Sequence, residues 1–116
     1  PIRMVLRRIL EASGHEVHEA SGGVDGLRLC RELGPDLVVT DLLMPDKSGL
    51  SVIASLVAES PGARIIALSG GGAGGKLNFL ATARTFKGVR TLQKPFQARE
   101  LMALVSEMLA STPEPR

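Results

Sequence analysis

The stretch Asp36–Gly49 constrains this chain more than any other part of the sequence. Its first half, from Leu37 to Thr40, is a short run of branched and apolar side chains that is typical of a strand buried on both faces. The run ends on Asp41, and Leu-Leu-Met-Pro and a polar turn follow. Ligands of open parallel sheets bind just beyond the carboxyl ends of the strands, so Asp41 is predicted to lie at a ligand site. The alternative interpretation is that the Asp41 carboxylate only caps a helix or marks a strand end exposed to solvent.

Helical and extended patterns alternate along the whole chain. This alternation predicts an α/β fold, a doubly wound parallel sheet with right-handed crossovers and helices on both faces. The chain nevertheless opens on a helix, where this architecture normally opens on a strand. We expect helices at about residues 2–12, 22–33, 50–57, 76–86 and 97–109, strands at 15–20, 36–41, 63–69 and 89–94, and a cap at Ser21 for the second helix.

Composition limits the classes of function that suit the chain. A length of 116 residues with 44% hydrophobic and 22% charged residues fits one globular domain. The formal net charge of +2 comes from scattered basic residues and the chain has no Trp or Tyr, so direct nucleic-acid binding is not expected. Cys30 is the only cysteine, which excludes an internal disulfide. No apolar run reaches the ~20 residues that span a bilayer, and we expect no membrane segment and a cytoplasmic protein by default.

Three of the expected strands end on residues that together suit a phosphate site, namely Asp41, Ser69 and Lys94. In a parallel sheet these three strand ends lie on one edge. The carboxylate can act as a nucleophile, while the hydroxyl and the ammonium can hold the transferred oxygens. Each residue alone is a weak signal, and their combination is a strong one.

The pattern resembles the receiver domain of bacterial two-component response regulators, over essentially the whole chain. The resemblance rests on Asp41 followed by Met44-Pro45 and Gly49, on Ser69 after an apolar strand, and on Lys94-Pro95-Phe96. It implies the flavodoxin-like, receiver-type fold of that family.

The resemblance also implies how such a domain works. A sensor histidine kinase or a phosphotransfer protein would phosphorylate Asp41, and Ser69 and Lys94 would contact the acyl phosphate. Mg²⁺ would be the cofactor, with Asp41 and the backbone carbonyl of Leu43 among its ligands. The domain would be a signalling module and not an enzyme. Its conformational switch would control an output through a homodimer, an effector domain or an effector protein.

Three features depart from the family pattern. Receivers carry an acidic pair at the end of a first, central strand, and neither the pair nor that strand is present in the sequence, which begins at Pro1. We therefore expect a receiver domain over residues 1–110 that is incomplete at its amino end, with 111–116 as a tail or the start of a linker. Three explanations for the missing strand and acidic pair remain open. The domain could have an additional upstream segment, another chain could fill the gap, or the domain could be an incomplete fragment. Thr91 stands where the family often has an aromatic switch residue, and a long glycine run follows Ser69.

Two other functions remain open from the sequence. Residues 70–76 match the spacing G-x-x-x-x-G-K of a phosphate-binding loop, which would make the chain a small nucleotide-binding domain. Leu77 stands against this reading because it occupies the position that needs Ser or Thr to ligate Mg²⁺. The second alternative is a pseudo-receiver, a docking or dimerisation module that works without phosphorylation because the acidic pair is missing.

Overall fold

The computed structural model of the chain describes residues 2–41, 49–60, 62–69 and 88–110. The helix expected at 76–86 and the glycine-rich loop at 70–76 lie outside these residues, and so do Leu43 and the tail at 111–116.

A three-stranded parallel sheet forms the centre of the described structure. Its strands are β1 (Val38–Asp41), β2 (Ile65–Ser69) and β3 (Val89–Gln93), in the order β1-β2-β3. All five residues of β2 are buried because this strand has a neighbour on each side. The strands expected at 36–41, 63–69 and 89–94 are confirmed, with shorter bounds.

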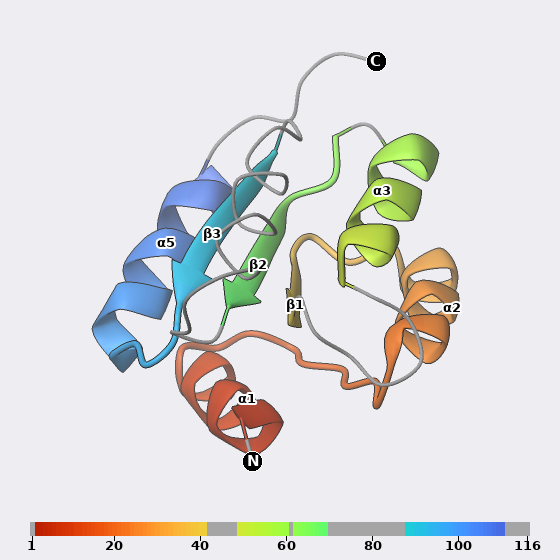
Figure 1. The fold of residues 1–116 in the computed structure, drawn as a ribbon. Coiled ribbons are helices and arrows are strands. Elements are labelled where there is room, and N and C mark those ends of the chain that lie inside the picture. The colour runs from red at the N-terminus through yellow and green to blue at the C-terminus, as the bar shows by residue number, and fades with distance from the viewer. Residues whose placement is uncertain (1, 42–48, 61, 70–87, 111–116) are drawn as a thin grey trace.

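Four helices are described, and they cover both faces of the sheet (Figure 1). They are α1 (Ile2–Ala12), α2 (Gly23–Leu33), α3 (Gly49–Glu59) and α5 (Ala98–Ala110). Apolar residues of α2 and α3 pack with Ile65, Ala67 and Val89 in one core cluster. Residues of α5 pack with Ile66 and Leu68 in a second cluster, which α1 borders. The predicted doubly wound arrangement is therefore confirmed for the described residues.

The helix ends are fixed by local hydrogen bonds. The backbone N–H of Gln97 donates to the Glu100 carboxylate at 2.9 Å, which is one of the two hydrogen bonds of a capping box, at the start of α5. The expected cap at Ser21 is wrong, because α2 begins at Gly23 and the residue in the cap position is Gly22. Glycine is accepted at this position even though it has no side chain to donate or accept a hydrogen bond.

The strand predicted at residues 15–20 is also wrong. This segment connects α1 to α2 and forms no ladder with any described strand, although its side chains alternate as in an edge strand. A strand exists only where a neighbouring backbone completes its hydrogen bonds, and alternation alone cannot supply that neighbour.

Candidate functional site

The carboxyl edge of the sheet carries the residues that the sequence singled out. Asp41 is the last residue of β1, and its Cα is the register partner of Leu68 on β2. Ser69 ends β2 beside Gln93 of β3, and Lys94 follows directly. Parallel pairing therefore brings the three residues to a common edge, as predicted.

Lys94 and Asp41 form a direct ion pair at this edge. The Lys94 Nζ donates to Asp41 Oδ2 at 2.6 Å, across 53 positions of sequence. The two side chains are 27% and 28% exposed, so the pair is partly shielded from solvent while it stays accessible from outside. A charge-assisted hydrogen bond of this length is stronger than a neutral one, and partial burial reduces its screening by salt.

Backbone contacts hold the lysine in place. The backbone N–H of Lys94 donates to the Ser69 carbonyl oxygen at 2.7 Å, which links the ends of β2 and β3. Ser69 itself is buried, with 3% of its surface exposed. The peptide bond between Lys94 and Pro95 is cis. The lysine ammonium is thus presented to Asp41 from a strand end fixed by its neighbour.

Thr91 lies on β3 opposite Ala67 of β2 and is half-buried. The resemblance identified it from the sequence as the expected switch position without an aromatic ring. The other residue named for the site, Leu43, lies outside the described residues.

The described residues give a divalent metal ion few ligands. Among them, no three His, Cys, Asp or Glu side chains gather closely enough to hold a metal ion. At the sheet edge the carboxylate donor is Asp41, which already accepts from Lys94. Mg²⁺ takes near-octahedral oxygen coordination, so these residues by themselves do not fit it.

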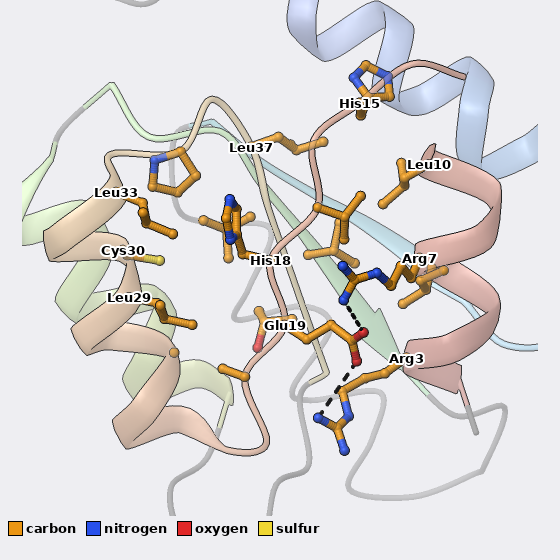
Figure 2. Close-up of a pocket in the computed structure, with 18 of the residues that line it drawn as sticks. Arg3, Arg7, Leu10, His15, His18, Glu19, Leu29, Cys30, Leu33 and Leu37 are labelled. Carbon is orange, nitrogen blue, oxygen red and sulfur yellow. Dashed lines mark hydrogen bonds and ion pairs between the residues drawn. The ribbon is translucent and has the colours of Figure 1, made fainter. Parts of the chain in front are cut away.

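A cavity of about 640 Å³ lies on the side of β1 that faces away from β2 (Figure 2). Its lining comes from α1, the segment 15–22, α2 and β1, and it reaches Asp41 at one end. In Figure 2 the labelled side chains of α1 lie on one side of it and those of α2 on the other. The residues that line this cavity were not predicted from the sequence.

Ionic contacts at the walls of this cavity were not predicted from the sequence. Arg7 donates to Glu19 at 2.8 Å and to Glu11 at 3.2 Å, and Arg3 lies 3.9 Å from Glu19 (Figure 2). The hydrogen bond that Arg7 donates to Glu19 is the main reason why the pKa of Arg7 is raised. The i,i+4 spacing of Arg3, Arg7 and Glu11 on α1 was the available signal, but it did not identify Glu19 as a partner.

Two further contacts involve α2. Arg31 donates to both carboxylate oxygens of Glu59 on α3, at 2.9 and 2.8 Å, and this hydrogen bonding lowers the pKa of Glu59. Cys30 lines the cavity, and burial raises the pKa of its thiol. The thiol therefore stays protonated at neutral pH.

The fold and the site define a class of protein: a parallel α/β domain with an acid and a lysine paired at the carboxyl edge of its sheet. The family model of the response regulator receiver domain matches residues 1–106. The chain belongs to this family, and it has the phosphoacceptor role of two-component response regulators at the level of the family. The resemblance identified from the sequence is confirmed.

Individual relatives support the same assignment. The chain is 31% identical over 103 residues to the chemotaxis protein CheY of Listeria monocytogenes, covering 87% of this chain and 83% of that protein. It is 34% identical over 110 residues to the sensor kinase CckA of Brucella abortus, covering 93% of this chain but 11% of that protein. A response regulator receiver domain protein from Clostridium thermocellum has a similar structure, with a TM-score of 0.84, 30% identity, and coverage of 93% of this chain and 85% of the other.

The flavodoxin-like fold class is thereby confirmed as well. The family consists of signalling domains that typically bind Mg²⁺ and interact with histidine kinases and effector domains. None of the described helices is long and apolar enough to cross a membrane.

Proposed function

We propose that Asp41 is the phosphoacceptor of this receiver domain, which extends over residues 1–110, with 111–116 as a tail or linker. The observation that carries the proposal is the ion pair between Asp41 and Lys94, 2.6 Å long and partly open to solvent. Of the carboxylates at the ends of β1, Asp41 has a lysine against it at the sheet edge where parallel folds bind ligands, whereas Asp36 is exposed at the opposite end.

In the proposed reaction a carboxylate oxygen of Asp41 attacks the phosphorus of a phosphohistidine on a sensor kinase or phosphotransfer protein. The new P–O bond forms as the P–N bond breaks, and the leaving imidazole takes up a proton. Phosphoryl transfer depends mainly on positioning and on neutralising the charge that spreads over the transferred oxygens. The Lys94 ammonium, which touches the carboxylate before the reaction, would bind one of these oxygens afterwards.

Ser69 would respond to phosphorylation of Asp41, and Thr91 is the expected switch position without an aromatic ring. A phosphoryl group on Asp41 adds negative charge and acceptor oxygens at the edge where β2 ends on Ser69. Its hydroxyl would move toward the phosphate and bias a two-state rearrangement of the neighbouring strands and helices. Thr91 has no ring to bury, so this response would reach the surface without an aromatic switch.

Mg²⁺ is the cofactor expected for the complete domain, and Asp41 and the Leu43 carbonyl are the proposed ligands in this chain. Mg²⁺ needs several oxygen ligands, and among the described residues at this edge Asp41 supplies the carboxylate. We therefore expect the 116-residue chain to bind Mg²⁺ weakly. Titration calorimetry should show no saturation at millimolar Mg²⁺. Tight binding would mean that the donor set is larger than proposed.

The proposed partners are a cytoplasmic sensor kinase or phosphotransfer protein upstream, and a second copy, effector domain or effector protein downstream. We expect the domain to act as a signalling module without an enzymatic substrate of its own. Direct binding to nucleic acid is not part of the proposal.

Labelling with a small acyl phosphate in the presence of Mg²⁺ tests the phosphoacceptor assignment. The wild-type protein should incorporate one phosphoryl group, and Asp41→Asn should incorporate none. The matched control is Asp36→Asn, which removes an exposed carboxylate at the other end of β1 and should label normally. Loss of the Lys94 ammonium in Lys94→Ala should slow labelling roughly a hundredfold, as for other groups that stabilise a developing charge.

Equal labelling of wild type and Asp41→Asn would contradict the assignment. No labelling of any form, together with unchanged partner binding in Asp41→Asn, would favour the pseudo-receiver. The nucleotide-binding alternative depends on residues 70–76, and a rise of the melting temperature with ATP would support it.

A further inference from the structure

Two polar side chains are buried among the described residues, and both lie near the carboxyl edge of the sheet. Ser69 ends β2 and is 3% exposed, and Thr40, the residue before Asp41 in β1, is 8% exposed. A buried hydroxyl costs free energy unless it is hydrogen-bonded, and a valine side chain has the same branched shape without that cost. Val38 and Val39 precede Thr40 in the strand. The hydroxyl at position 40 is therefore expected to make a specific contact.

The contact of this hydroxyl is with the backbone of the next residue. Thr40 Oγ1 donates to the carbonyl oxygen of Asp41 at 3.1 Å, in a partly buried hydrogen bond. Asp41 is the last residue of β1, and its register partner Leu68 is the last one that the ladder with β2 pairs. The side chain of Thr40 thus holds the backbone at the point where the strand ends.

Thr40 acts on the backbone of Asp41 and not on its carboxylate. Neighbouring residues of a strand point to opposite faces of the sheet. The register agrees with this, because Thr40 pairs with Ala67 of the core cluster formed with α2 and α3, whereas Asp41 pairs with Leu68 of the cluster formed with α5. The hydroxyl therefore lies on the other face of the sheet from the ion pair with Lys94.

A fixed carbonyl also limits where the carboxylate lies. The branched side chain of Thr40 has few rotamers, so its hydroxyl holds the Asp41 carbonyl in one orientation. This orientation restricts the ψ angle of Asp41, and the side-chain rotamers that a residue adopts depend on its backbone angles. The carboxylate is in this way kept against the Lys94 ammonium, 2.6 Å from it. Position matters for the rate, since a displacement of about 1 Å can slow a reaction about a hundredfold.

We propose that Thr40 is a positioning residue for phosphoryl transfer, whose buried hydroxyl fixes the backbone of Asp41 and thereby holds the carboxylate against Lys94. This inference rests on the proposed role of Asp41 as the phosphoacceptor. It explains why a hydroxyl is buried in an otherwise apolar strand, because a valine at position 40 would fill the same space but could not hold the carbonyl.

Substitutions at position 40 separate the hydroxyl from the shape of the side chain. Thr40→Val keeps the branched shape and removes the hydroxyl, whereas Thr40→Ser keeps the hydroxyl and removes a methyl group. Val39→Ala is the matched control, because it truncates the half-buried neighbour in the same strand and leaves the hydroxyl in place. The full chain of each variant is labelled with acetyl phosphate and Mg²⁺ well below its melting temperature, which is measured separately.

Labelling and stability should follow different orders. Thr40→Val should label on the order of fivefold more slowly than wild type, the equivalent of one hydrogen bond, while its melting temperature stays within about 5 °C of wild type. Thr40→Ser and Val39→Ala should melt at lower temperatures because they lose buried apolar groups, yet both should label within about twofold of wild type. Labelling rates that simply follow the melting temperatures of the three variants would overturn the proposal.

A second measurement does not require phosphorylation. The rate at which N-hydroxysuccinimidyl acetate acetylates the Lys94 amine, followed by mass spectrometry, reports how often the pair with Asp41 opens, and Asp41→Asn gives the rate without the pair. Thr40→Val should raise this rate toward that of Asp41→Asn, and Thr40→Ser and Val39→Ala should leave it unchanged. Equal rates in wild type and Thr40→Val would overturn the proposal. Wild-type protein that takes up no phosphate but shows the expected acetylation rates would contradict the phosphoacceptor role of Asp41 and confirm that Thr40 positions it.

Discussion

The strands β1 and β2 have similar apolar sequences but different surroundings. β2 lies between two strands and between two layers of helices, and all of its residues are buried. β1 pairs with β2 along one side and faces the cavity along the other, and Thr40 is its only buried residue. The burial of a strand is thus decided by what lies beside it, and the predictions below test this difference.

The largest expected effect comes from truncating register partners on the two strands. Ile66 is fully buried and pairs with half-buried Val39. We expect Ile66→Ala to lower the free energy of unfolding by about 2–5 kcal/mol, because the cavity that it leaves is enclosed on all sides. Val39→Ala should cost about 1 kcal/mol, because part of its surface already faces open space.

Urea unfolding followed by circular dichroism measures both changes. Equal costs for the two variants would contradict the difference between the strands.

A smaller effect is expected at two glycines with positive φ, one on each side of the molecule. Gly88, before β3, has φ +81°, and a Cβ there would lie 2.5 Å from the carbonyl oxygen of Ala63. Gly14, before the segment 15–20, has φ +89° but no atom within 4 Å of such a Cβ. Gly88→Ala should therefore cost about 2–3 kcal/mol through strain and backbone collision, and Gly14→Ala about 1 kcal/mol through strain alone.

The melting temperatures of the two glycine variants, measured side by side, give this comparison. A larger drop in melting temperature for Gly14→Ala than for Gly88→Ala would mean that the surroundings of Gly14 are packed more tightly than the structure indicates.

The smallest effect concerns the ion pair between Arg31 of α2 and Glu59 of α3. Hydrogen bonds from Arg31 lower the pKa of Glu59 below its ordinary value of 4.5. A carboxylate with a lowered folded-state pKa stabilises the fold above its unfolded pKa, and this contribution is lost as the pH falls through the folded-state pKa. Stability should decline slightly below about pH 4.5 for this reason, and the effect is small because the pair is exposed.

Urea midpoints above and below this pH, for wild type and Glu59→Gln, measure the contribution. The variant should lose a small part of the acid dependence. An identical pH dependence of the urea midpoint in wild type and Glu59→Gln would mean that the Arg31–Glu59 pair does not stabilise the contact between α2 and α3.

Much of the fold followed from local patterns. The helical spacing from Ile2 to Ala12 and the apolar run before Asp41 each predicted the correct element, because a helix completes its hydrogen bonds locally and a buried run needs no alternation. The strand predicted at residues 15–20 was wrong because a strand depends on hydrogen bonds to a neighbouring strand. Its alternation is correct for an edge strand, but the structure describes no strand beside it.

The sequence by itself determined the family, the order of helices and parallel strands, and the placement of Asp41, Ser69 and Lys94 at strand ends, since these depend on periodicity and on motifs within short stretches. The tertiary structure alone decided that Lys94 reaches Asp41 within 2.6 Å, that Arg7 meets Glu19, and that a cavity opens beside β1. These depend on contacts between residues distant in sequence and on the space left between packed elements, neither of which a local pattern specifies.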